Sequence, residues 1–133
     1  HTILRRQRQM CIRDSTKGFS AIAISPKPVG IDIQDFRDKI LSISKKFINS
    51  NERDLIDPSS IKELTLVWCI NEATYKVHRK PGLDFKDEIK IQSISNNLSH
   101  STVEVEKLDK KYFFESFNIT ESDYICSIVQ SNE

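Results

Sequence analysis

Four side chains in this sequence have the chemistry needed to hold a cation beside a phosphate group. Asp32 and Gln34 are two positions apart in PVGIDIQDF, so a strand turns both toward the same face. Glu72 and Lys76 are four positions apart in WCINEATYK, so a helix places both on one stripe. Carboxylate and amide oxygens suit Mg²⁺, which makes Asp32, Gln34 and Glu72 candidate metal ligands. Lys76 would supply the positive charge that a phosphoryl group in transfer needs.

Each of these features also has an ordinary structural explanation. A Glu–Lys pair four residues apart is a common surface salt bridge. An aspartate in a strand is often a turn or edge residue, and Trp68, one turn before Glu72, is at a spacing more typical of core packing than of ligand stacking. From composition and spacing alone, the structural explanation is the commoner one.

Length and composition indicate a single globular domain of 133 residues, with 38% hydrophobic and 29% charged residues. Lys and Arg total 20 against 19 Asp and Glu, so net charge gives no reason to expect a nucleic acid or a membrane as partner. The three cysteines (Cys11, Cys69 and Cys126) form no CxxC motif, which favours reduced thiols in a cytoplasmic protein over a disulfide framework or a zinc site. No apolar run reaches the length of a membrane-spanning helix.

The first fifteen residues, HTILRRQRQMCIRDS, do not fit the rest of the sequence. They are basic and lack a clear period, which could indicate a nucleic-acid or membrane-surface arm or a short solvated tail. MCIRDS also resembles translated adapter sequence at the end of assembled reads, and we favour that interpretation. We therefore predict a non-native leader over 1–15 and a domain over 16–133, and we leave the leader out of the functional argument.

The first half of the domain combines strands with helices. Weak alternation of apolar residues predicts strands over 18–25 and 29–33. Helical spacing predicts a helix over 35–47 with Asp35 as its cap, and NSNERDLI, at 49–56, predicts a short helix opened by an Asn or Ser cap.

The longest helix is predicted over 57–80. Ser59 or Ser60 caps it, and Glu63 stands three residues past Ser60, as in a capping box. Four apolar residues at helical spacing define its core face: Leu66, Ile70, Ala73 and Val77.

Past Gly82, alternating or β-branched segments separated by polar turns predict a run of strands. These predicted strands are 88–94, 102–108, 112–119 and 124–130. Two strands, a helical block and then four strands indicate an α+β chain, with an antiparallel sheet packed against the long helix.

Two spaced motifs carry a family resemblance. GIDIQ and WCINEATYK resemble the signature pair of 4'-phosphopantetheinyl transferases, roughly G-[IV]-D-[IV]-[EQ] and W-[ST]-x-K-E-A-x-x-K. Between them, KKFINSNERDL resembles the F-x-x-x-x-E segment of that family, and RKPGLDF resembles its K-x-x-G-L continuation. The resemblance runs from about Thr16 to Ile94 and implies the 4'-phosphopantetheinyl transferase-like fold.

The resemblance implies a role for each candidate residue. Asp32, at a strand's end, and Glu72 would bind Mg²⁺ at the coenzyme A pyrophosphate, with Gln34 at a third metal position that is often Glu. Lys76 would contact the transferring phosphate and, with Lys80, bind coenzyme A. Glu72 would also be the general base that acts on the serine of an acyl or peptidyl carrier protein. The implied reaction yields holo carrier protein and adenosine 3',5'-bisphosphate.

The segment before the first motif, TKGFSAIAISPKP, resembles the surfactin-type enzymes, which are longer and pseudo-dimeric. We therefore expect the C-terminal part of such an enzyme, one half of a pseudo-dimer, in a cytoplasmic protein of the kind that serves fatty acid biosynthesis. Two alternatives remain open at this point. One is a short trimeric holo-acyl-carrier-protein synthase, and the other is a non-catalytic fragment that only binds coenzyme A or carrier protein.

Several positions depart from the family pattern. Asn71 replaces the lysine of the second motif, which removes a charge that helps to hold coenzyme A in the family. Cys69 takes the place of a small Ser or Thr and is expected to be a buried small residue. Ser15 stands where a histidine is expected. His78 and His100 match no motif position, and we expect structural roles for both.

Overall fold

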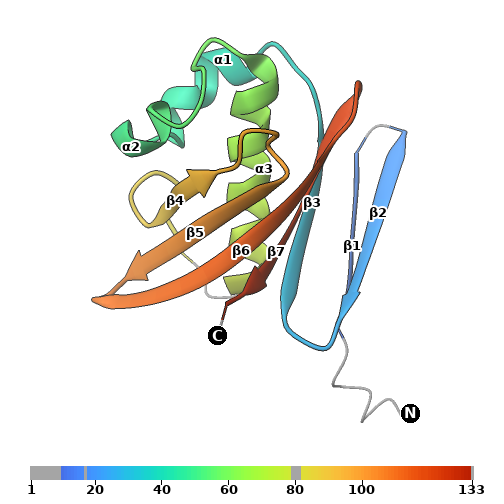
Figure 1. Cartoon of the computed structure of the whole chain (residues 1–133), viewed down its shortest axis with the longest axis vertical. Coiled ribbons are helices and arrows are strands. Elements are labelled where there is room, and N and C mark those ends of the chain that lie inside the picture. Colours follow the sequence, from blue (N-terminus) through green and yellow to red (C-terminus); the bar gives the residue numbers. More distant parts are fainter. Residues whose placement is uncertain (1–9, 17, 79–81, 133) are drawn as a thin grey trace.

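The computed structural model describes residues 10–16, 18–78 and 82–132, with only the main chain of residues 10–13. A long helix, α3 (Ile61–His78), lies against one face of a five-stranded sheet, and a two-stranded hairpin lies beside that sheet (Figure 1). All neighbouring strands described are antiparallel. The predicted α+β chain, with an antiparallel sheet against a long helix, is confirmed. Its place as one half of a pseudo-dimer stays a prediction.

The main sheet has the strand order β3-β7-β6-β5-β4, so its first strand in the sequence pairs with its last. This pairing places Asp32 opposite Ser127. The strand bounds are β3 (Val29–Asp35), β4 (Ile89–Ile94), β5 (His100–Lys107), β6 (Lys110–Thr120) and β7 (Tyr124–Ser131). All five strands predicted for this part of the chain are present, and β3 runs past its predicted end at residue 33 as far as Asp35.

The hairpin consists of β1 (Met10–Thr16) and β2 (Phe19–Ser25), and its register begins with Met10 opposite Ser25. β2 confirms the strand predicted over 18–25. Most of β1 belongs to the predicted leader, of which residues 1–9 lie outside the described residues. The interpretation of residues 1–15 as non-native stays a prediction.

The long helix α3 begins where its capping residues predict. Ser60 Oγ accepts a hydrogen bond from the main-chain nitrogen of Glu63 at 3.2 Å. The reciprocal half of the capping box is not formed, because the Glu63 side chain accepts instead from the nitrogen of Asp57 at 3.1 Å. The whole predicted core face is buried: Leu66, Ile70, Ala73 and Val77.

The single helix predicted over 35–47 is wrong. That stretch instead contains one short α-helix, α1 (Ile40–Ile43), followed by a 3₁₀ turn, η2 (Ser44–Lys46). Asp35 is not a helix cap, because β3 continues through it and pairs it with Tyr124 of β7. Tertiary strand pairing therefore overrides the local helical spacing.

A second short helix, α2 (Ser50–Arg53), confirms the prediction for 49–56 and carries a complete capping box. The Asn49 side chain accepts from the nitrogen of Glu52 at 2.9 Å, and Glu52 accepts in return from the nitrogen of Asn49. The Glu52 carboxylate also accepts from the nitrogen of Ile91 in β4 at 2.8 Å. Its burial raises the pKa of Glu52 to about 7. One buried carboxylate thus joins the start of α2 to the edge of the sheet.

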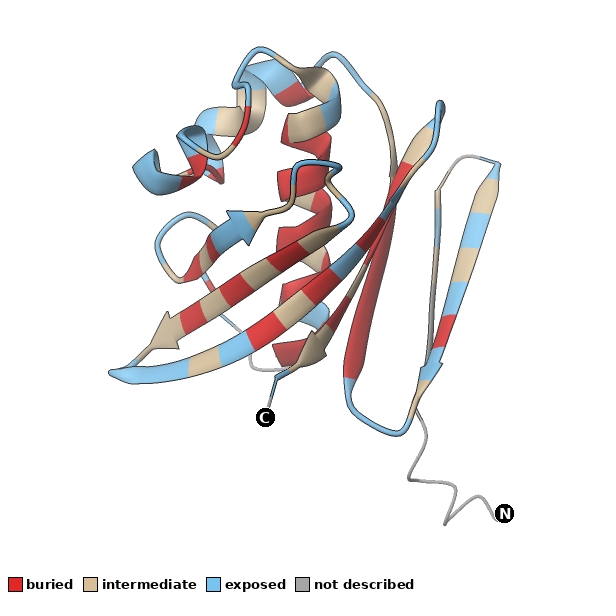
Figure 2. Ribbon diagram, in the orientation of Figure 1, coloured by how far each residue is buried: buried red, intermediate tan, exposed pale blue. Residues whose placement is uncertain are grey.

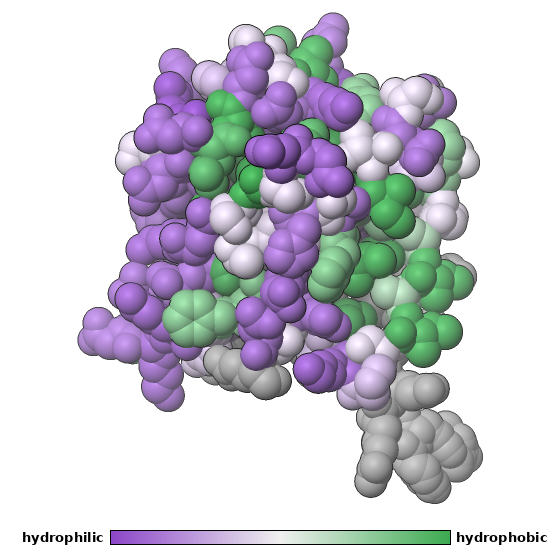
Figure 3. All heavy atoms as spheres, in the orientation of Figure 1, coloured by the Kyte–Doolittle hydropathy of each residue, from purple (hydrophilic) through white to green (hydrophobic). Residues whose placement is uncertain are grey.

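The main core lies between α3 and the sheet, and the opposite face of the sheet is more open (Figure 2). On β6, alternate side chains point away from α3, and Phe113, Phe117 and Ile119 are exposed there. Figure 3 shows hydrophobic side chains on the side of the molecule that carries β2, where Ile22 and Ile24 are exposed. Within the described residues, no helix combines the length and the apolar character needed to cross a membrane.

Candidate functional site

Asp32 is the buried charge of the candidate site. It lies in the middle of β3, not at the strand's end as expected, and only 3% of its surface is exposed. Gln34 Nε2 donates to Asp32 Oδ2 at 2.7 Å, and Lys76 Nζ donates to Asp32 Oδ1 at 3.2 Å. Burial raises the pKa of Asp32 to about 7, against the opposing effects of Gln34 and Lys76. Both oxygens of this carboxylate therefore have polar partners, as a buried charge requires.

The close approach of α3 to β3 brings these residues together. A Cβ at Gly30 would overlap the main-chain carbonyl of Ala73 and would lie 2.9 Å from the nitrogen of Val77. Only glycine permits this separation between strand and helix. Cys69, one turn before Ala73 on the same helix, is buried as predicted, and its Sγ donates to the main-chain carbonyl of Asp32 at 3.2 Å. The motif glycine and the small Cys69 are thus packing residues that set the distance across the site.

Lys76 reaches from α3 to the strand. Its Nζ donates to the carbonyl oxygen of Ile31 at 2.9 Å, pairs with Asp32, and lies 3.4 Å from Asp14 Oδ2. Burial works to lower the pKa of Lys76, but the Asp32 and Asp14 carboxylates outweigh it and hold the pKa above its usual value. Lys76 therefore does not form the surface salt bridge to Glu72 that its spacing suggested. Its ion pairs in the described residues are with Asp14 and Asp32.

Glu72 lies one helical turn before Lys76 and is half-buried. Burial raises the pKa of Glu72, the Asp14 carboxylate adds to that effect, and Lys76 opposes it. A carboxylate whose pKa is raised toward neutrality is a better general base than an ordinary surface glutamate. The structure thus places Glu72 within the electrostatic reach of Lys76 and of Asp14.

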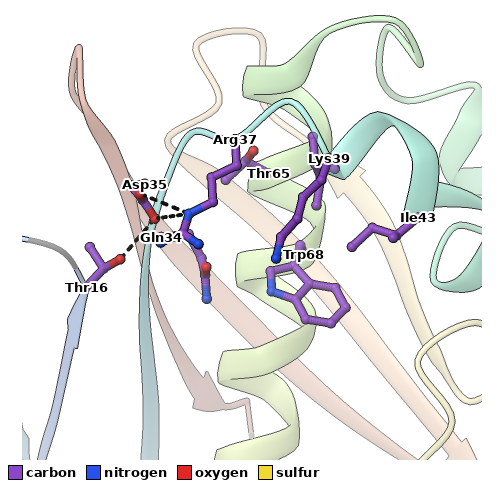
Figure 4. Close-up of a pocket in the computed structure, with 9 residues that line it drawn as sticks. Thr16, Gln34, Asp35, Arg37, Lys39, Ile43, Thr65 and Trp68 are labelled. Carbon is purple, nitrogen blue, oxygen red and sulfur yellow. Dashed lines mark hydrogen bonds and ion pairs between the residues drawn. The ribbon is translucent and has the colours of Figure 1, made fainter.

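Gln34 connects this cluster to a surface hollow of about 280 Å³ (Figure 4). The Gln34 and Trp68 side chains line the hollow, and Lys39 reaches over it toward the indole ring. Trp68 packs between Phe47 and Phe85, as expected for a core residue. It also lines the hollow, so core packing is only one of its roles. One side of Trp68 belongs to the core and the other to the hollow.

Asp14 is a residue of this site that the sequence argument missed. Its Oδ2 accepts a hydrogen bond from the main-chain nitrogen of Ile33 at 2.9 Å and lies near Lys76. Asp14 falls in the segment set aside as a leader, so no motif points to it. β1 pairs with β2 and lies beside β3, and this arrangement, which no sequence pattern indicated, brings Asp14 to the site.

The donor set fits a hard divalent cation. In the described part of the chain, no three carboxylate, imidazole or thiol groups are grouped closely enough to hold a metal ion by themselves. Mg²⁺ asks for less, since it commonly takes one or two carboxylates and completes its octahedron with water and substrate phosphate. Asp32 and Gln34 are in contact, and Glu72 lies one turn before Lys76 on α3, so these three are the residues that would hold such an ion. The ammonium group on Asp32 also shows that this point attracts positive charge.

The remaining predicted residues fall in different places. Lys80 lies outside the described residues. Asn71 is completely buried, so its side chain is not at the surface, where the family lysine would meet coenzyme A. His78 is buried against Tyr112, and His100 lies 3.2 Å from Glu115 Oε1, so both have the structural settings expected of them.

A comparison with protein families now identifies the class. The family model of the 4'-phosphopantetheinyl transferase superfamily matches residues 28–129, a range that contains both motifs and the whole cluster except Asp14. The chain belongs to this superfamily, whose members transfer phosphopantetheine groups. A search of curated proteins found no match to the chain. The resemblance read from GIDIQ and WCINEATYK is thus confirmed at the level of the superfamily.

Proposed function

We propose that this chain is a surfactin-type, Mg²⁺-dependent 4'-phosphopantetheinyl transferase that acts in the cytoplasm. It moves the phosphopantetheine group of coenzyme A to a serine of an acyl or peptidyl carrier protein of fatty acid, polyketide or peptide synthesis. The observation that carries the proposal is the meeting of the two motifs at one point, where Lys76 of α3 contacts Asp32 of β3. The family match over residues 28–129 supports the reaction class.

In the proposed reaction, the carrier serine Oγ attacks the β-phosphorus of coenzyme A. The bond from that phosphorus to the bridging oxygen breaks, and adenosine 3',5'-bisphosphate leaves with the electron pair. Glu72 accepts the serine proton, directly or through water, which its raised pKa favours. Lys76 provides positive charge to the phosphoryl group in transfer.

Asp32 and Glu72, with Gln34, are the residues that would hold Mg²⁺ in this proposal. The bound ion would neutralise the charge of the pyrophosphate. The hollow that Gln34 and Trp68 line would receive the substrate beside Gln34 (Figure 4). Lys76, and Lys80 by the family resemblance, would contact coenzyme A.

The test is transfer itself. The chain is incubated with apo carrier protein, coenzyme A and Mg²⁺, and the carrier is weighed by mass spectrometry. We expect a gain of one phosphopantetheine group, and we expect Asp32→Ala to abolish it at every Mg²⁺ concentration. Asp123→Ala, an exposed aspartate in the turn before β7, is the matched control and should retain transfer.

Two results would count against this function. Full transfer by Asp32→Ala would remove Asp32 from the site. No transfer by this chain, alone or joined to an upstream surfactin-type half, would favour a non-catalytic protein that only binds coenzyme A or the carrier. Transfer only with the added half would support the pseudo-dimeric enzyme over the short trimeric synthase.

A further inference from the structure

The cation position at Asp32 is filled by a side chain of the protein. We propose that Lys76 is the resident cation of this site and that a divalent metal ion takes its place on Asp32 Oδ1, releasing the ammonium group toward the substrate phosphate. This inference rests on the proposed function, because it explains how one lysine can serve both the empty and the loaded site.

Lys76 has a limited number of hydrogen-bond donors. A lysine ammonium has three N–H donors. In this structure Nζ faces three oxygens, at 2.9 Å from Ile31 O, 3.2 Å from Asp32 Oδ1 and 3.4 Å from Asp14 Oδ2. Two of these contacts are hydrogen bonds and the third is an ion pair, so Lys76 Nζ must loosen at least one of them to bring its charge to a phosphate oxygen.

The two oxygens of Asp32 differ in how they are held. Gln34 Nε2 occupies Oδ2 at 2.7 Å, the shortest contact that this carboxylate makes. Gln34 therefore positions Asp32 and turns Oδ1 toward the cation. If this contact stays intact, a metal ion that binds Asp32 must bind Oδ1, the oxygen that now accepts a hydrogen bond from Lys76.

Of the two ion-pair partners, Lys76 is the one whose side chain can move. The Asp32 side chain is 5% exposed and fixed in the middle of β3, whereas the Lys76 side chain is 36% exposed. A lysine side chain has a flexible four-carbon stem, so it can swing outward while its helix stays in place. A metal ion and an ammonium group on the same carboxylate oxygen would be only a few ångströms apart and would repel each other, so binding of the metal opposes residence of the ammonium.

The proposal predicts that Lys76 weakens metal binding. Mn²⁺, used as the probe, is titrated into the full chain without coenzyme A and followed by electron paramagnetic resonance. We expect Lys76→Met to bind Mn²⁺ about tenfold more tightly than the unchanged chain, since the competing charge is gone. Lys90→Met removes a lysine that is ion-paired with Glu106 outside the site and should leave the affinity unchanged.

A second measurement needs no variant. Acetic anhydride acetylates free amines, so the rate at which Lys76 is acetylated, read by mass spectrometry, reports how freely its amine is exposed. We expect Mg²⁺ to raise the acetylation rate of Lys76 severalfold and to leave that of Lys90 unchanged. This readout remains available if Lys76→Met fails to fold.

The outcomes separate the two proposals. Equal Mn²⁺ affinity with and without Lys76, or an acetylation rate that saturating Mg²⁺ leaves unchanged, overturns the exchange. If the unchanged chain still transfers phosphopantetheine, either result leaves the proposed function standing. Absence of Mn²⁺ binding together with absence of transfer overturns both.

Discussion

Position 34 holds an amide where the family resemblance leads us to expect a carboxylate in many members. The amide nitrogen of Gln34 faces Asp32 and donates to it, so the side chain acts as an anchor for the neighbouring carboxylate. A glutamate could not donate in this way and would place a second negative charge beside a buried one. The choice of Gln therefore avoids a second negative charge beside the buried Asp32.

This difference gives a prediction for Gln34→Glu. The added carboxylate increases the charge offered to a divalent cation, so we expect the Mg²⁺ concentration for half-maximal transfer to fall by about tenfold. The measurement is the initial rate of carrier modification across a Mg²⁺ series. Gln92→Glu, at an exposed position of β4, adds the same charge outside the site and should change nothing. An unchanged Mg²⁺ requirement for Gln34→Glu would mean that this side chain is not a ligand.

Single residues were predictable to the extent that they belong to motifs. Asp32, Gln34 and Lys76 are at one site as the two motifs predict, and the hydrogen bond between Gln34 and Asp32 confirms that both face the same side of the strand. The partner of Lys76 was not predictable from the helix alone, because the i,i+4 rule points to Glu72. Asp14 was not predictable because its place depends on how a hairpin folds back beside β3.

At the scale of elements, the site depends on the contact between β3 and α3. Gly30 faces the Ala73 carbonyl, and the distance between strand and helix lets Lys76 reach Ile31 and Asp32. The main chain of a helix cannot yield as a flexible side chain can, so any larger residue at position 30 must push the two elements apart. The glycine of the first motif is thus required for the close packing of β3 against α3.

We expect Gly30→Ala to lower the free energy of unfolding by about 1–3 kcal/mol or more, as overpacking of a core does. Urea unfolding followed by circular dichroism measures the loss. Gly18→Ala is the control for adding a methyl group: nothing lies within 4 Å of its Cβ, although its φ of +80° carries a conformational cost of its own. Equal losses for the two variants would contradict a specific role for the contact at Gly30.

Elements with strong local signals were predicted well, and those decided by distant partners were not. The cap of α3 at Ser60 and the capping box of α2 are local hydrogen bonds that the sequence shows directly. The region 35–47 has helical spacing, but its first residue is held in β3 by pairing with Tyr124, far along the chain. Only short helical pieces then fit between the strand and α2.

At the scale of the whole molecule, buried carboxylates make stability depend on pH. Burial raises the pKa of Glu52 from an ordinary value near 4.5 to about 7, and that of Asp32 in the same direction. Between these two values the folded chain binds more protons than the unfolded chain. The free energy of unfolding from these groups is therefore greatest below about pH 4.5 and falls as pH rises to 7.

We expect Glu52→Gln to flatten this decline, because the amide does not titrate. The measurement is urea unfolding in metal-free buffer at a series of pH values from 4.5 to 8, with the slope compared between variants. A single group changes that slope by at most about 1.4 kcal/mol per pH unit. Asp123→Asn, exposed before β7, is the control. A slope that Glu52→Gln leaves intact would show that Glu52 does not take up the proton.

The contact at Gly30 also limits where the chain can change in length. From Gly30 to Asp32 the strand advances by two residues and keeps the same face, and from Ala73 to Lys76 the helix advances by less than one turn. One inserted residue in the first interval would turn the carboxylate to the opposite side of the sheet, and one in the second would rotate the lysine by about 100°. The connection between them includes residues 36–60, and a change of length in its exposed turns would leave the register of both short intervals intact. Aligned relatives should therefore show gaps in this connection and none in the two short intervals, which makes insertion and deletion patterns an independent record of the site.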